Sequence, residues 1–399
     1  MDIIELFKEA ARRGASDIHL KVGKPPYFRL SGQLQPLEDH PPLTQKQLMT
    51  AFDTIARARH KDRLRRERVA DFSVAIEDYG RYRVNAYYQM GTLAMAVLLI
   101  SPRVRSVEEL NLPPQLNRLA LEDRGLILVT GVAGTGKSTT LAALLDYINH
   151  HKAVSIITIE DPIEYVLTED KALISQREVG EDTLSFLSGL KEALRQDPNV
   201  IMVGEMRDLE TIATALIAAE TGHLVFSTLH TMDAKETLNR IISVFPAAQQ
   251  DQIRVQLASV LKAVISQRLV PRADGQGLVP AVEIMVVTAR IRELIRDPEK
   301  TLEIPTAIAE GVVPYGMQTF DQSLYYLWRR GLITREVALE YANQPEVLAM
   351  RMQGISRGVD GGMWGYFDAL AEEAKRREAE AGGTPETASE PTGGSPSGT

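Results

Sequence analysis

The chain has 399 residues, of which 44% are hydrophobic and 25% are charged, and its formal net charge is −8. This length suggests two or more domains at roughly 150 residues each, and the absence of cysteine excludes disulfides, cysteine-ligated zinc, iron–sulfur clusters and thiol nucleophiles. Because nucleic-acid-binding proteins usually carry a basic balance, the acidic net charge argues against DNA or RNA as a partner.

Residues 1–100 are predicted to form a small α+β domain with an antiparallel sheet. An amphipathic helical pattern, MDIIELFKEAARRG, comes first, and short apolar stretches between turn signals follow it. Residues 43–68 combine helical spacing with many charges. Further strands are predicted at residues 71–76, 79–88 and 93–100. The prolines within residues 101–117 indicate a linker.

The sequence pattern changes over residues 118–288, where continuous apolar stretches alternate with stretches of helical spacing. This alternation predicts a parallel sheet covered by helices on both faces, and so an α/β fold class. Strands are predicted at residues 125–130, 154–160, 200–203 and 223–228. Helices are predicted at residues 137–150, 186–196, 209–220, 234–244 and 249–264. Residues 267–270 and 280–286 are expected to add an antiparallel element.

The rest of the chain is predicted to be a helical part over residues 289–350 and a tail over residues 351–399. The tail is expected to be disordered from about residue 381, where Gly, Pro, Ser, Thr and Glu dominate. Trp364, Phe367 and Ala371 recur at helical spacing. We expect this stretch to pack on its own domain rather than to dock on a ring or a membrane.

A phosphate-binding loop is predicted from GVAGTGKS, residues 131–138, which matches G-x-x-x-x-G-K-[ST] between a strand and a helix. The glycines let backbone N–H groups point at phosphates, and the helix N-terminus adds positive potential. Lys137 is predicted to reach the β- and γ-phosphates of ATP, and Ser138 to bind Mg²⁺. The predicted nucleotide-binding residues are Gly131, Val132, Ala133, Gly134, Thr135, Gly136, Lys137, Ser138 and Thr139.

Two strands are predicted to deliver acids beside this loop. ITIEDPIEY, residues 157–165, ends in Glu160, Asp161 and Glu164, and in parallel sheets ligands lie at the carboxyl ends of strands. Pro162 ends the strand, so Glu164 lies beyond the turn, free to reach the γ-phosphate. VIMVGEMRD, residues 200–208, ends in Glu205, which is either a Mg²⁺ ligand or a surface acid; the preceding phosphate-binding loop favours the former.

TGHLVFSTLH, residues 221–230, places His223 before a further strand and His230 after it. Ser227, Thr228 and His230 together suggest a phosphate sensor. Metal ligation is not expected, because the other histidines show no matching spacing.

These four boxes, in this order, resemble the secretion ATPases of type II secretion and type IV pilus machines. Within that family the chain resembles most the PilT-type retraction ATPases of type IV pili. The stretches GASDIHLKVGKPPYFRLSGQL, LRQDPNVIMVGEMRDLETIATALIAAETGHLVFSTLHT and RGLITREVALEYANQPEVL carry the likeness, which covers roughly residues 1–350.

The resemblance implies a homo-hexameric ring of subunits, each with a PAS-like N-terminal domain and a RecA-like ATPase domain. It implies that Glu164 is the general base, that Glu205 helps to hold Mg²⁺ and water, and that Glu160, His223 and His230 lie at the nucleotide. It also implies arginines from a neighbouring N-terminal domain. The candidate arginines are Arg81, Arg83, Arg105 and Arg124.

The expected function is Mg²⁺-dependent ATP hydrolysis that powers pilus retraction. The expected partner is the inner-membrane platform protein of the pilus, which would hold the ATPase at the cytoplasmic face of that membrane. In the resembled family the extension and secretion ATPases usually carry a four-cysteine zinc module, so the absence of cysteine favours retraction over extension. An accessory retraction ATPase, a bifunctional pilus motor, a nucleotide-gated assembly factor and a nucleic-acid translocase remain as alternatives.

Overall fold

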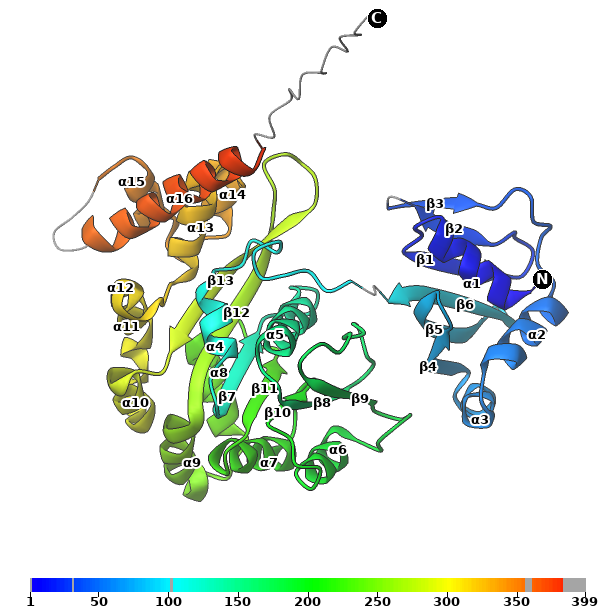
Figure 1. Cartoon of the computed structure of the whole chain (residues 1–399), viewed down its shortest axis with the longest axis horizontal. Helices are drawn as coiled ribbons and strands as arrows, with labels where there is room; N and C mark the ends of the chain where they lie inside the picture. The colour runs from blue at the N-terminus through cyan, green and yellow to red at the C-terminus, as the bar shows by residue number, and fades with distance from the viewer. Residues whose placement is uncertain (1, 31, 101–102, 356–360, 383–399) are drawn as a thin grey trace, which may run out of the picture.

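The computed structural model describes residues 2–30, 32–100, 103–355 and 361–382, and Figure 1 shows its two sheets with their helices. The N-terminal sheet is antiparallel throughout, with the strand order β3-β2-β1-β6-β5-β4. Its elements are α1 (Ile3–Arg12), β1 (Asp17–Lys21), β2 (Tyr27–Leu30), β3 (Gln33–Pro36), α2 (Gln45–Ile55), α3 (Ala58–Glu67), β4 (Val69–Ile76), β5 (Gly80–Gln89) and β6 (Thr92–Ile100).

This N-terminal sheet agrees with the predicted α+β domain, and residues 43–68, with their helical spacing, form the two helices α2 and α3. The chain is extended at Ala56 and Arg57, and α3 begins after them. The ring of His60 accepts a hydrogen bond from the Arg57 N–H at 3.2 Å, which favours a new helix start at this point.

The second sheet has the order β13-β12-β7-β11-β10-β8-β9, and β7, β8, β9, β10 and β11 run parallel. Its elements are α4 (Gln115–Ala120), β7 (Gly125–Thr130), α5 (Lys137–His151), β8 (Ser155–Glu160), β9 (Leu173–Glu178), α6 (Phe186–Ala193), β10 (Val200–Val203), α7 (Leu209–Glu220), β11 (Leu224–Leu229), α8 (Ala234–Ser243), α9 (Ala247–Val260), β12 (Leu261–Pro271) and β13 (Leu278–Val286). The predicted α/β class is confirmed.

Helices bury both faces of this sheet, as the continuous apolar strands predict. One core cluster joins the sheet to α6, α7, α8 and α9, with Leu216 and Leu257 fully buried. The other cluster joins it to α4 and α5, with Leu116 and Leu144 fully buried. The sheet is therefore the middle layer of the domain, and the ends of its strands are left as the place for a site.

Two features of this sheet differ from the prediction. The edge strand β9 was not predicted, because its sequence LISQRE is polar and half-exposed. The helix predicted over residues 249–264 ends at Val260, and its last residues belong to β12. Ala263, Val264 and Ile265 are fully buried beside β7, so the sheet centre outweighs the helical spacing.

The predicted linker over residues 101–117 is packed rather than free in its described part. Val107, Leu110 and Leu112 are buried in the cluster that contains α4 and α5. The predicted domain boundaries therefore stay predictions, with this segment lying against the ATPase sheet.

The C-terminal part is helical, as predicted. Its elements are α10 (Ala289–Arg296), the 3₁₀ helix η1 (Pro298–Glu303), α11 (Ile304–Glu310), α12 (Val312–Tyr315), α13 (Phe320–Arg329), α14 (Arg335–Glu340), α15 (Pro345–Met352) and α16 (Gly361–Gly382). Phe367 and Ala371 are buried on α16, and Trp364 packs edge-on against Tyr325 of α13 at 5.1 Å, so this stretch does pack on its own chain.

Residues 383–399, where the tail is expected to be disordered, lie outside the described residues. Over the part of the chain that the structure describes, no helix has both the length and the apolarity to cross a membrane.

Replacing Glu283 by Gln should change how thermal stability depends on pH. Burial on β13 raises the pKa of Glu283 to about 7, despite the hydrogen bond that it accepts from the Ala234 N–H at 2.8 Å. A raised folded-state pKa stabilises the fold below the unfolded pKa, and this stabilisation is lost as pH rises through about 7.

We expect the Glu283→Gln protein to match the wild type in Tm at about pH 4 and to exceed it above about pH 8. Glutamine keeps an oxygen for Ala234 but carries no charge. Calorimetric Tm values that run parallel for the two proteins across this range would contradict the prediction.

Candidate active site

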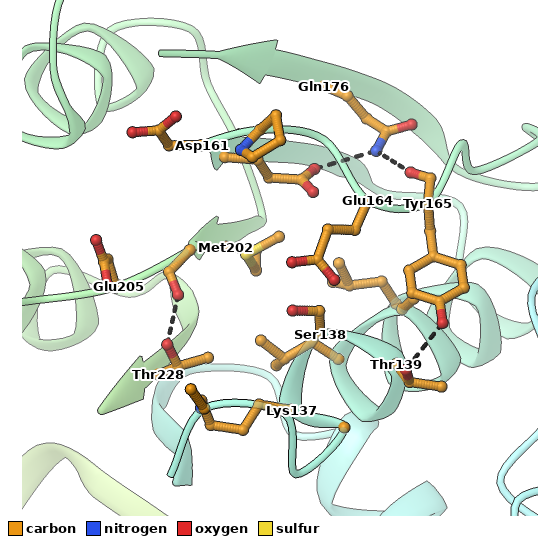
Figure 2. A pocket seen from close by; sticks show the side chains of 18 of the residues that line it. Lys137, Ser138, Thr139, Asp161, Glu164, Tyr165, Gln176, Met202, Glu205 and Thr228 are labelled. Carbon is orange, nitrogen blue, oxygen red and sulfur yellow. Dashed lines mark hydrogen bonds between the residues drawn. The ribbon is translucent and has the colours of Figure 1, made fainter. Parts of the chain in front are cut away.

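A cavity of about 550 Å³ opens at the carboxyl ends of the parallel strands. Four segments supply most of its lining: the loop and first turns of α5, the turn after β8, the turn after β10, and the end of β11. Gln176 of β9, Phe186 of α6 and Leu269 of β12 complete it. Figure 2 shows side chains from all four segments facing the same space. The predicted position of the site, at the carboxyl edge of the sheet, is therefore where the structure has its cavity.

The loop between β7 and α5 has the backbone shape that phosphate binding requires. Gly131, Gly134 and Gly136 all have positive φ, and Gly136 caps α5 in the left-handed conformation. A Cβ on Gly131 would lie 2.5 Å from the backbone oxygen of Gln267, so no other residue fits there without a shift. The loop therefore points its N–H groups and the α5 N-terminus toward the cavity.

Gln267 of β12 anchors this loop, which sequence reasoning missed. Its side chain is buried, and its Nε2 donates to the Thr135 carbonyl at 2.7 Å while its Oε1 accepts from the Thr140 hydroxyl at 2.8 Å. Gln267 is more than 120 residues away in the chain, so only the sheet order could reveal the contact.

Lys137 lies within the loop that it is predicted to serve. Its Nζ donates to the carbonyls of Gly131 at 2.9 Å and Val132 at 3.0 Å. Burial lowers the pKa of Lys137, and the carboxylates of Glu164 and Glu205 act in the opposite direction. The ammonium group is thus held by two carbonyls that a phosphate could replace as partners.

The three acids after β8 are separated by their surroundings. Glu160 is buried and accepts hydrogen bonds from the Thr158 hydroxyl at 2.6 Å and from Gln176 Nε2 at 3.1 Å. Burial raises the pKa of Glu160. Although it lines the cavity, as predicted, its carboxylate is already occupied by protein partners.

Asp161 and Glu164 are both exposed, but Glu164 points toward Ser138 in Figure 2, whereas Asp161 points away. The Asp161–Pro162 peptide bond, which is cis, lies between them. Two hydrogen bonds hold the next residue, Tyr165: its hydroxyl meets Thr139 at 2.8 Å, and its carbonyl accepts from Gln176 at 2.8 Å. Glu164 is therefore the carboxylate that is both accessible and positioned.

Glu205 lines the opposite side of the cavity. Its Oε2 lies 2.7 Å from Arg207 Nε and 3.6 Å from His230 Nε2, so one carboxylate gathers both groups. The turn lies close to β8 at Gly204, whose N–H donates to the Ile159 carbonyl at 2.8 Å and whose missing Cβ would lie only 3.2 Å from the same oxygen. Arg207 was not among the predicted residues, although it lies in the quoted VIMVGEMRD stretch.

Other predicted residues lie elsewhere in this chain. His223 precedes β11, at the amino end of a strand whose carboxyl end carries His230, and its Nδ1 contacts the Ala218 carbonyl at 2.9 Å. His223 therefore does not line the cavity of its own chain, and its place at a nucleotide stays a prediction.

None of the four candidate arginines lines the cavity. Arg105 and Arg124 are exposed, and Arg124 directly precedes β7 at the amino edge of the sheet. Arg83 lies 3.7 Å from Asp71 within the N-terminal domain. Arg81 pairs with Glu178 of β9 at 2.9 Å. A role at the phosphates would require a neighbouring subunit or another arrangement of the domains.

Comparison with known proteins places this site in a family. The family model described as Type II/IV secretion system protein matches residues 2–307. The chain belongs to this family.

Two curated relatives and one solved structure match nearly the whole chain. The Type IV pilus retractation ATPase PilT of Pseudomonas aeruginosa is 46% identical over 87% of this chain and 99% of its own length. The Type IV pilus ATPase PilU of the same organism is 38% identical over 88% of this chain and 92% of its own. The crystal structure of the pilus retraction motor PilT with bound ADP has a TM-score of 0.81, with 45% identity, and covers 88% of this chain and 99% of that one.

Replacing Glu164 by Gln should lower ATP turnover by about a hundredfold or more, because general-base catalysis contributes on this scale. Glutamine keeps the size of the side chain but cannot accept a proton from water. ATP affinity should stay close to that of the wild type, because Lys137 and the loop are untouched.

Turnover of purified protein and equilibrium binding of an ATP analogue test this pair of expectations. Glu210→Gln on α7 is a matched control, because it removes an exposed carboxylate that does not line the cavity. Near-normal turnover by the Glu164→Gln protein would remove Glu164 from its proposed role.

Proposed function

We propose that this chain is a Mg²⁺-dependent ATPase that powers retraction of type IV pili. The observation that carries the proposal is the convergence of Lys137, Ser138, Glu164 and Glu205, from three separate segments, on one cavity beside a complete phosphate-binding loop. Membership of the secretion ATPase family and likeness to PilT over nearly its whole length support the function.

Each of these side chains has a role that follows from its charge and place. Lys137 and the loop N–H groups hold the phosphates and neutralise their charge. Glu164, which is accessible and fixed through Tyr165, orients the attacking water and accepts its proton. Glu205 lies beside Arg207 and His230, and these two groups would sense the γ-phosphate and the attacking water.

A magnesium ion fits the donors that face the cavity. Mg²⁺ takes oxygen ligands and keeps several waters, so it needs few protein ligands. The hydroxyl of Ser138 and the carboxylate of Glu205 both line the cavity and would hold the ion. When bound, the ion supplies charge neutralisation of the β- and γ-phosphate oxygens.

We also propose that the chain works as a homo-hexamer with ATP sites completed between domains, bound through the pilus platform protein at the cytoplasmic face of the inner membrane. Arg207 is the arginine among the residues that line the cavity, and it already pairs with Glu205. A further cation for the phosphates would therefore come from another domain or subunit. Hydrolysis would then move the N-terminal domain against the ATPase domain.

The alternatives are weaker. An accessory ATPase like PilU is favoured less, because identity to PilU is 38% against 46% to PilT. A binding protein without turnover would have no need of an accessible Glu164 beside the phosphate-binding loop. A nucleic-acid translocase fits poorly with a net charge of −8.

Deleting the gene in its own bacterium should leave cells with more pili than the wild type and without twitching motility. Pili would still extend but would no longer be withdrawn. Complementation with the wild-type gene should restore twitching, and complementation with Lys137→Ala should not, because that variant lacks the ammonium group that neutralises the phosphates.

Counts of surface pili and twitching-zone diameters measure this outcome, with protein levels compared by immunoblot. Deletion cells that keep most of their twitching would assign the chain to an accessory role. Full rescue by Lys137→Ala would contradict the proposed ATP-dependent motor.

A further inference from the structure

Glu178 is a buried carboxylate that no part of the proposed mechanism uses. It ends β9, at the edge of the ATPase sheet nearest the N-terminal domain, and its side chain is 3% exposed. Figure 1 shows β9 on the side of the sheet that faces β4 and α3. A buried carboxylate is costly unless it is paired and hydrogen-bonded, so its partners decide what it does.

The partners of Glu178 come from two parts of the chain. From the N-terminal domain, Ser73 Oγ of β4 lies 3.0 Å from both carboxylate oxygens, and Arg81 Nη2 of β5 lies 2.9 Å from Oε2. From the ATPase domain, the Ile163 N–H donates to the same Oε2 at 3.3 Å. One oxygen atom therefore contacts the N-terminal domain and the segment that carries Glu164.

The residue that donates from the ATPase domain directly precedes Glu164. Ile163 is itself buried, so its N–H has no access to solvent and depends on Glu178 as its acceptor. A shift of the Glu178 carboxylate would move or release this N–H, and with it the backbone that aims Glu164 at the cavity.

A second acid of the same turn supports the contact between the domains. Glu181, three residues after Glu178, forms ion pairs with Arg57 and Arg59 and meets His60 Nε2 at 2.6 Å. His60 is buried, and burial, followed by Arg59, lowers its pKa to about 4, so it is neutral at physiological pH and donates Nε2–H to Glu181. The turn after β9 is thus held by the N-terminal domain at two points.

We propose that Glu178 is a positioning residue. It couples the contact between the N-terminal domain and β9 to the orientation of the Glu164 side chain, through the Ile163 N–H. Arg81 acts through Glu178 and not at the phosphates. When the N-terminal domain moves away, Glu178 loses Ser73 and Arg81, and the segment of Glu164 loses a fixed acceptor. The inference rests on the proposed ATPase function, and it adds the residue by which domain position controls turnover.

A double-mutant cycle on the full-length protein tests this coupling. Arg81→Gln and Glu178→Gln should each lower kcat by about tenfold while KM for ATP changes by less than about threefold, because the water-orienting group is misplaced and the phosphate-binding loop is not. The double variant should be no slower than either single variant, because both changes break one path.

Arg81→Lys keeps the positive charge at this position, so it should recover most of the lost kcat. Arg65→Gln is the matched control, because Arg65 is an exposed arginine of α3 that contacts Asp62 at 3.4 Å within its own helix. That control should leave kcat unchanged. Losses that multiply in the double variant, or an Arg81→Gln variant whose defect lies in KM, would instead place Arg81 at the nucleotide and overturn the proposal.

Hydrogen–deuterium exchange of the peptide spanning residues 161–165 gives a readout that does not need turnover. Exchange should be faster in Arg81→Gln and in Glu178→Gln than in the wild type, while peptides of β10 and β11 stay unchanged. Unchanged exchange at residues 161–165 in Arg81→Gln would overturn the proposal even if Glu178→Gln fails to fold. Absence of ATPase activity in the wild type would instead defeat the proposed function and leave this exchange result standing.

Discussion

The register of the parallel strands is the constraint on which the site depends. Ile159 of β8 lies opposite Val203 of β10, Val203 lies opposite Ser227 of β11, and Leu229 lies opposite Thr130 of β7. Because all four strands end at one edge, the segments that follow them emerge side by side. A shift of one residue in any of these pairings would turn the following side chain away from the cavity.

Three carboxylates in the part of the chain that the structure describes are buried, and each is held by partners of its own chain. Glu160 is held by Thr158 and Gln176, Glu178 by the N-terminal domain, and Glu283 by the N-terminus of α8. Each has hydrogen-bond or cation partners, as buried polar groups require, and burial raises the pKa of Glu160 and Glu283. Glu160 is already held by protein partners and Asp161 points away in Figure 2, so Glu164 and Glu205 are the acids of the cavity that remain for chemistry.

Sequence reasoning predicted the local parts of the site and missed the parts that depend on distant contacts. The loop at residues 131–138 and the separation of Glu164 from Glu160 followed from glycine and proline chemistry within a few residues. Gln267 and Glu178 lie more than 95 residues from most of their partners, so no spacing rule could find them. His223 and His230 lie at opposite ends of β11, so only His230 reaches the cavity of this chain. The strand β9 was missed because a polar edge strand lacks an apolar pattern.

The central claim is that Glu164 drives ATP hydrolysis and that hydrolysis drives retraction. Imaging of fluorescently labelled pili, in cells that produce Glu164→Gln in place of the wild-type chain at equal level, tests both steps at once. The account predicts pili that extend and then stay extended, with retraction events nearly absent. Retraction at wild-type frequency and speed in these cells would contradict it.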